Sequence, residues 1–134
     1  MRIATEILPA AEGLGNMGGA GRQVTAKEIL VGARALVDQG WCQGVDARDA
    51  QGDRCAPWHR EARAWSVLGA LVASEGDEPD VRAHAAASIA ELGHAVALLA
   101  DAAETSSLQA WNDAPGRTVE EVLGVFDRAL ARLS

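Results

Sequence analysis

Aromatic residues are scarce in this chain of 134 residues, which has no tyrosine, one phenylalanine and an aromatic fraction of 4%. Sheet proteins depend on branched and aromatic side chains, whereas closely packed helices tolerate small ones. Alanine supplies much of the hydrophobic fraction of 49%, and a chain of this length has room for one hydrophobic core and no second domain. We therefore expect a single all-α domain.

Basic residues are also few. The sequence holds 12 Lys and Arg against 19 Asp and Glu, a net charge of −7, and no window of it is dominated by basic side chains. Proteins that bind nucleic acids or anionic membranes neutralise phosphates with such side chains. The composition therefore predicts no nucleic-acid partner and no membrane partner.

Long apolar runs are missing as well. The first residues lack the uninterrupted hydrophobic stretch of a secretory signal, and no run reaches the roughly 18 apolar residues that a membrane helix needs. We expect a soluble, cytoplasmic protein. In that compartment its two cysteines are expected to be reduced thiols rather than a disulfide.

The N-terminal segment is rich in glycine, which makes ordering of the backbone entropically costly. It contains the stretch EGLGNMGGAGRQ, which has neither a preceding strand nor the Lys-Ser/Thr pair of a phosphate-binding loop. We expect residues 1–24 to form a flexible arm and residues 25–134 to form the helical domain.

Helical signals recur along the domain. Thr25–Glu28 and Thr118–Glu121 are capping boxes, in which a threonine hydroxyl and a glutamate carboxylate satisfy backbone N–H groups at a helix start. Apolar residues at helical spacing follow both boxes, and Gly40 is expected to end the first helix. A second helix is expected from Pro57 through WSVLGAL. The third carries the longest amphipathic run, with its apolar positions at Val81, Ala85, Ile89, Leu92, Val96 and Leu99.

The segment ETSSLQAWNDAPGR separates the third helix from the fourth, because Asn-Asp and Pro-Gly favour turns. The predicted architecture is therefore a compact bundle of about four amphipathic helices. The loop between the first two helices, GWCQGVDARDAQGDRC, is long for such a bundle, and we expect a small turn or hairpin at Ala50–Asp53. Asp46, Asp49 and Asp53 lack the glycine and glutamate spacing of a calcium loop and are expected to be turn residues.

The long loop suggests two kinds of reactive site, a zinc site and a nucleophilic thiol. Cys42, Cys55 and His59 could offer zinc two thiolates and an imidazole, but there is no C-x-x-C pair and no evident fourth ligand, so no metal site is expected. Cys42 could instead be a nucleophile with His59, His84 or His94 as its base. It follows the C-terminal end of the first predicted helix, however, where the helix dipole raises the pKa of a thiol. We expect both cysteines to be small, buried structural residues.

Three motifs follow one another along the chain: GWCQG after the first predicted helix, WSVLGAL in the second and WNDAPGRTVEEVL at the start of the last. In this order and spacing they resemble a family of small actinobacterial and phage proteins known only as a domain of unknown function, number 6197. The likeness covers residues 25–134, and the glycine-rich arm and the stretch RCAPWHREARA depart from it. The resemblance implies a helical domain with no assigned activity. The residues that match its motif positions are Trp41, Cys42, Gln43, Asp46, Trp65, Trp111, Asn112, Asp113 and Thr118.

The motif residues admit two interpretations. Tryptophans at helix ends would bury large apolar surfaces, with their indole N–H groups bonded to Asn112, Asp113 or Gln43, which would make the motifs a scaffold. The same groups could line a small-molecule pocket of aromatic walls with a few amides and carboxylates. The candidate ligand-binding residues of that pocket are Trp41, Gln43, Trp65, Trp111, Asn112 and Asp113.

Two functions follow from these interpretations. The first is a non-enzymatic helical module without a cofactor that binds a protein partner or itself, with a homodimer as its expected form. The alternative is a small cofactor-free enzyme or substrate-binding helper, for instance in a natural-product pathway, with its site between the Trp41–Asp46 loop and Trp111–Asp113. The candidate catalytic residues of that enzyme are Asp113, Asp46, His59 and Cys42.

Overall fold

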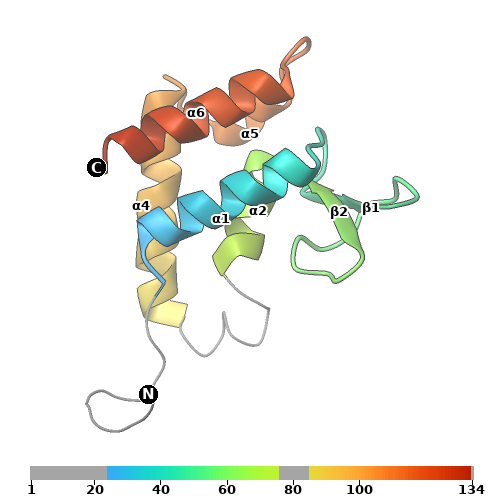
Figure 1. The fold of residues 1–134 in the computed structure, drawn as a ribbon, viewed down its shortest axis with the longest axis horizontal. Coiled ribbons are helices and arrows are strands. Elements are labelled where there is room, and N and C mark those ends of the chain that lie inside the picture. Colours follow the sequence, from blue (N-terminus) through green and yellow to red (C-terminus); the bar gives the residue numbers. More distant parts are fainter. Residues whose placement is uncertain (1–23, 76–84, 134) are drawn as a thin grey trace, which may run out of the picture.

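The structure is a computed structural model that describes residues 24–75 and 85–133. In these residues the chain forms five helices and one two-stranded sheet (Figure 1). The flexible arm predicted for residues 1–24 falls, apart from Val24, outside the described residues. The elements in chain order are α1 (Ala26–Gln39), β1 (Ala47–Asp49), β2 (Ala62–Trp65), α2 (Val67–Glu75), α4 (Ala85–Ala102), α5 (Leu108–Asn112) and α6 (Val119–Ala131).

The predicted helical class is right in outline, since most of the described chain is helical. The small sheet corrects the strictly all-α prediction. Within the described ranges, no helix has the length and apolar character needed to cross a membrane.

Both predicted capping boxes are present. At the start of α1, Thr25 Oγ1 accepts from the Glu28 N–H at 3.2 Å, and the Glu28 carboxylate accepts from the Thr25 N–H at 3.0 Å. At the start of α6, Thr118 Oγ1 accepts from the Glu121 N–H at 3.2 Å, and Glu121 accepts from the Thr118 N–H at 2.9 Å. Local sequence therefore fixes where these two helices begin.

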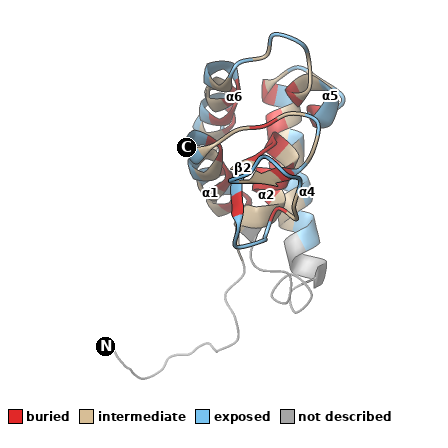
Figure 2. Ribbon diagram, turned by 90° about the vertical axis from the view of Figure 1, so that its right-hand side faces the viewer, coloured by how far each residue is buried: buried red, intermediate tan, exposed pale blue. Residues whose placement is uncertain are grey.

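The hydrophobic core lies between α1 and the helices that contact it, α2, α4 and α6. Figure 2 shows the buried positions facing inward from each helix. Among the described side chains of α4, from Ile89 onward, those of Ala95, Leu99 and Ala102 are buried, whereas Ile89 is 65% exposed. The apolar face predicted for the third helix was therefore wrong at Ile89, because α4 carries apolar residues around most of its circumference and only part of it meets the core.

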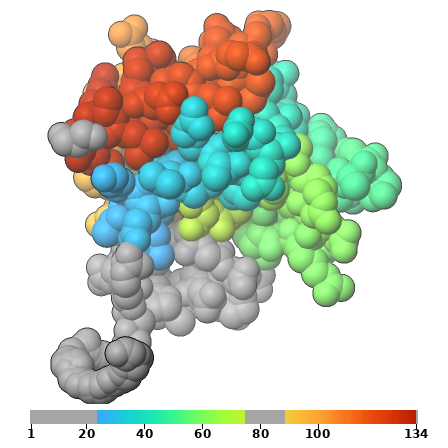
Figure 3. Space-filling view, viewed as in Figure 1, coloured from blue at the N-terminus to red at the C-terminus, as the bar shows by residue number. Residues whose placement is uncertain are grey.

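Residues 41–65 form a lobe beside the helices, visible to the right in Figure 3. In it β1 pairs antiparallel with β2, with Ala47 opposite Trp65. Two single bridges extend this pairing, a parallel one from Trp41 to Trp65 and an antiparallel one from Arg48 to Arg54. The turn expected near Ala50–Asp53 forms, with the Asp49 N–H donating to the Asp53 carbonyl at 2.8 Å.

The second helix begins later than predicted, at Val67 rather than at Pro57. Residues 62–65 pair with β1 as a strand, so Trp65 belongs to the sheet and not to a helix. Ser66 then starts α2, because its Oγ accepts from the Gly69 N–H at 3.0 Å in the manner of an N-cap. The segment expected only to break the helices contains the additional helix α5, capped by the Ser107 hydroxyl.

Gly40 ends α1 as predicted, and its N–H donates to the Leu36 carbonyl at 3.1 Å. Its backbone is extended, with φ of −175°, rather than in the left-handed conformation in which many helices end. A β-carbon at this position would overlap the carbonyl oxygen of Arg63. The close approach of β2 to the end of α1 is thus the structural reason for glycine here.

Candidate functional site

Asn112, at the end of α5, lies at the centre of the motif residues and is 1% exposed. Its Oδ1 accepts hydrogen bonds from Trp41 Nε1 at 2.8 Å and from the Val67 N–H at 3.0 Å. Its Nδ2 donates to the Cys42 carbonyl at 3.2 Å and to Asp113 Oδ1 at 2.9 Å. An asparagine side chain has two acceptor sites and two donor protons. Groups of the protein itself therefore use the whole hydrogen-bonding capacity of this buried amide.

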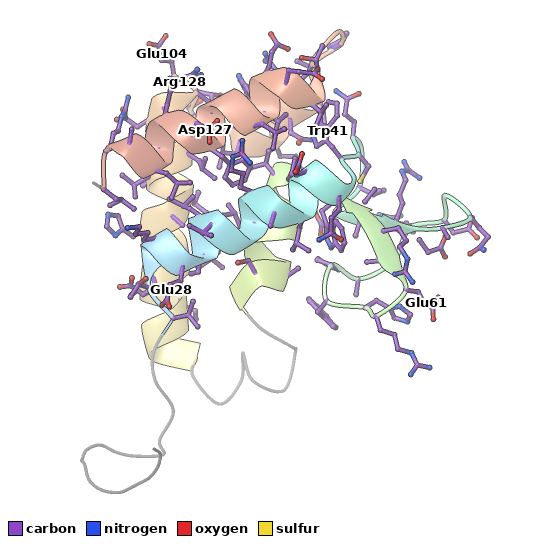
Figure 4. All side chains as sticks on the ribbon, in the orientation of Figure 1. Glu28, Trp41, Glu61, Glu104, Asp127 and Arg128 are labelled. Carbon is purple, nitrogen blue, oxygen red and sulfur yellow. The ribbon has the colours of Figure 1, made fainter. Side chains whose placement is uncertain are left out.

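The loop after α1 is bound to the chain after α5 at further points. Gln43 Nε2 donates to the carbonyl oxygens of Asn112 at 2.9 Å and Ala114 at 3.0 Å. The Gly44 N–H donates to Asp113 Oδ1 at 2.9 Å, and its φ of 87° suits glycine. We call residues 41–44, residues 112–114 and Val67 the Asn112 cluster. Figure 4 shows Trp41 at the junction between the helices and the lobe, where this cluster joins them.

Trp111 is half-buried and its ring is covered by Arg117. The guanidinium carbon lies 3.9 Å from the ring centroid, and Arg117 Nε donates to the Trp111 carbonyl at 2.9 Å. The same guanidinium lies 3.7 Å from the carboxylate of Glu121, which belongs to the capping box of α6. Arg117 therefore links the end of α5 to the start of α6 through a cation–π contact, a hydrogen bond and an ion pair.

Two candidate residues, Trp65 and Asp46, lie outside the Asn112 cluster. Trp65 is 7% exposed, and its indole N–H donates to the Pro57 carbonyl at 2.9 Å inside the lobe. Asp46 is exposed and contributes its backbone carbonyl, which accepts from the Ser66 N–H at 3.0 Å. Asp46 thus joins the lobe to the N-cap residue of α2, whereas the Trp65 indole bonds within the lobe. Neither residue is hydrogen-bonded to the Asn112 amide.

Cys42 and Cys55 are both free thiols. Cys55 is only partly buried, so the expectation of two buried cysteines is wrong for Cys55. Cys42 is buried, and its sulfur lies 3.7 Å from the Val45 carbonyl oxygen as a weak donor. Burial is the main cause that raises the pKa of the Cys42 thiol; Arg48 opposes the shift, and Asp113 adds to it. The pKa of Cys55 is also raised, first by desolvation and then by Asp49. Both thiols are therefore held in the protonated form, which is a poor nucleophile.

His59, a candidate base for Cys42, is hydrogen-bonded within its own turn. It is exposed, and its Nδ1 accepts from the Glu61 N–H at 3.0 Å, which fixes the imidazole against its own turn. In the described part of the chain, no three His, Cys, Asp or Glu side chains gather closely enough to hold a metal ion. His59 is therefore bonded to Glu61 and not to the Cys42 thiol, and His84, another histidine considered as a base, lies outside the described residues.

Two residues of this region were missed by the sequence analysis. Ser66 is 7% exposed and caps α2, and its signal was a serine directly before the apolar run VLGALV. Arg117 covers Trp111, and no local pattern marked it, because the contact depends on the turn at residues 113–116.

The Asn112 amide is fully engaged within the cluster. All of its hydrogen bonds go to groups of the protein itself, whereas the polar groups of a small-molecule site converge on free space. What these groups do is join three parts of the chain: the loop after α1, the start of α2 and the end of α5.

No curated protein and no solved structure matches this chain. The sequence pattern of one family does match it, over residues 21–132, which is most of its length. The chain belongs to this family, the family of unknown function DUF6197.

Proposed function

We propose that this protein is a non-enzymatic helical module that acts in the cytoplasm by associating with itself, as a homodimer, or with a protein partner. The observation that carries the proposal is the saturated hydrogen bonding of the buried Asn112 amide. Motif groups that bond to one another stabilise the fold and leave no polar group of the Asn112 amide for a substrate. We therefore expect other molecules to bind at the outer surface of the protein.

The outer face of α4 supports self-association. Ile89 is 65% exposed there, and a β-carbon added at Gly93 would meet no atom within 4 Å. The exposed residues of this helix with described side chains are Ile89, Ala90, Gly93, His94, Ala97 and Asp101. Most of them are small or apolar, so the backbone of a second helix could approach closely.

A two-fold axis near Gly93 would pair two copies of this face. It would place Ile89 of one copy opposite Ala97 of the other, four residues on either side of Gly93, in a closed, isologous contact. Burial of each Ile89 side chain would contribute about 1.5–3 kcal/mol. The small positions around it let the two helices pack without a clash.

Light scattering after gel filtration, over a wide dilution series, tests the homodimer. We expect a mass of twice the 14.0 kDa chain at the higher concentrations, and Ile89→Asp should shift the equilibrium to the monomer. Val31→Asp is the matched control, because Val31 is 51% exposed and belongs to a different helix, α1. A monomer at every concentration, or an equal effect of both variants, would rule out this interface.

A further inference from the structure

The turn that precedes β2 in the lobe presents an exposed tryptophan. Trp58 is 39% exposed, although its neighbour Pro57 is buried and the Pro57 carbonyl accepts from the core indole of Trp65 at 2.9 Å. Two backbone bonds close the turn, from the His59 N–H to the Ala56 carbonyl at 3.0 Å and from the Ala62 N–H to the His59 carbonyl at 2.9 Å. The backbone is thus anchored on both sides of a large apolar ring that remains in contact with water.

The same turn is locally basic in an acidic protein. Residues 54–63 hold three arginines and one glutamate, a net charge of +2, so the other 124 residues of this chain of net charge −7 carry −9. All three arginines are exposed, and the Arg60 side chain is 93% exposed. Arg63 Nη1 donates to the carbonyls of Arg60 at 2.9 Å and Ala62 at 2.8 Å, which holds its guanidinium at the turn. Figure 4 shows Glu61, the one acidic residue of this turn, at the lower edge of the lobe.

Tryptophan and arginine are the residue types most enriched among those that dominate binding energy in protein interfaces. An indole offers apolar area at low conformational cost, and a guanidinium offers a planar pair of donors that fits a carboxylate. We propose that residues 54–63, the Trp58 turn, are a docking surface for an acidic segment of a protein partner. An apolar side chain of that segment packs on Trp58, and its carboxylates pair with Arg60 and Arg63.

Charge decides between the possible occupants. A nucleic acid would meet only three cations, with Glu61 among them, on a chain whose remaining charge of −9 repels a polyanion. An isologous contact with a second copy, centred on this turn, would bring Arg60 and Arg63 close to the same arginines of the partner. A short acidic segment from a different protein avoids both repulsions. This surface shares no residue with the α4 face, so either proposal can fail while the other stands.

Selection from a random dodecapeptide library on the immobilised full chain tests the proposal. We expect the enriched peptides to carry a net negative charge and an aromatic or branched apolar residue. Fluorescence anisotropy of a labelled selected peptide should show Trp58→Ala and Arg60→Glu weakening Kd by about tenfold or more, and binding should weaken as salt is raised.

Arg128→Glu is the matched control, because it makes the same charge change at an exposed arginine of α6 (Figure 4). It should leave Kd within about twofold. The proposal is overturned if no peptide is enriched, if the enriched peptides are neutral or basic, or if the two turn variants bind as well as the parent. Tighter turn-dependent binding of oligothymidylate would reassign the surface to nucleic acid, and loss of the dimer in Trp58→Ala would reassign it to a second copy.

Discussion

Replacement of Asn112 by alanine is the sharpest test of whether the motif residues form a scaffold or a ligand site. The change removes the acceptor of the Trp41 indole and of the Val67 N–H, together with the donor to the Cys42 carbonyl. Val67 is 2% exposed and Cys42 is 9% exposed, so these backbone groups have little access to water. The variant therefore leaves buried polar groups without partners.

The expected loss follows from these groups. Each unpaired buried donor or acceptor costs about 1–3 kcal/mol. Trp41 is only half-buried, and a water molecule entering the space of the lost amide would recover part of the loss. We expect the free energy of unfolding to fall by about 3–5 kcal/mol, which is at the upper end for a single substitution. At this chain length the melting temperature should fall by roughly 10–20 °C.

Urea denaturation followed by circular dichroism measures this loss, with an unchanged m-value as the sign that the unfolding transition is the same. Gln109→Ala is the matched control, because Gln109 is exposed on the same short helix α5 and should change stability by less than about 0.5 kcal/mol. A loss below about 1.5 kcal/mol for Asn112→Ala would refute the scaffold interpretation, since it would mean that the buried groups find other partners with ease.

Three further outcomes are expected. Asn112→Asp places a buried carboxylate beside Asp113 and the Cys42 carbonyl. These neighbours and the burial raise the pKa of the new carboxyl group in the folded state above its pKa in the unfolded state. In urea titrations the variant should therefore lose stability relative to the parent as the pH rises from the unfolded-state pKa toward the folded-state pKa. Cys42→Ala should lower the free energy of unfolding by about 1 kcal/mol. Mass spectrometry should show that iodoacetamide modifies Cys42 of the parent slowly at neutral pH, because burial raises the pKa of this thiol. Fast modification of the folded protein would contradict this. Thr118→Ala removes the cap of α6 and should cost about 1 kcal/mol in urea, and an unchanged midpoint would show that the cap contributes nothing.

Local chemistry predicted the parts of the fold that depend on neighbouring residues. The capping boxes at Thr25 and Thr118 satisfy backbone groups three residues away, so the sequence contains both partners of each bond. The structure also brings together Trp41, Gln43, Asn112 and Asp113, which the motifs had grouped. The indole donor and the amide acceptor were both visible in the sequence, although their pairing was one of several that the chemistry allowed.

The lobe could not be predicted in the same way. The stretch REARAWS has apolar residues at spacings that suit a helix, and nothing within it favours a strand. Residues 62–65 become a strand because Ala47 and Arg48, which lie more than a dozen residues earlier in the chain, offer them a pairing edge. A tertiary contact therefore overrides the local pattern, and it moves the start of the following helix from Pro57 to Val67.

The orientation of α4 was unpredictable for another reason. Its apolar residues point in most directions, so several faces could have met the core, and the choice of Leu99 over Ile89 depends on where α1 and α6 lie. A binary pattern of apolar and polar residues specifies a buried face only when the opposite face is polar. Because α4 has apolar residues on more than one face and only one face meets the core, Ile89 stays exposed. The outer face of α4 is therefore a candidate interface.

Gly69 shows how far the lobe constrains the helices. Glycine in a helix interior is normally less stable than alanine by about 1 kcal/mol, so helix propensity predicts that Gly69→Ala in α2 stabilises the fold. In the structure a β-carbon at Gly69 would overlap the Asp46 carbonyl and lie 2.8 Å from its carbon, and forced overlap of this kind costs about 1–3 kcal/mol. Gly124 in α6 is the matched control, because a β-carbon there would meet only the Arg128 guanidinium, at 3.7 Å. Urea titration should therefore show Gly69→Ala losing stability while Gly124→Ala gains about 0.5–1 kcal/mol. Stabilisation by both changes would mean that the Asp46 carbonyl does not lie against Gly69 as closely as the structure shows.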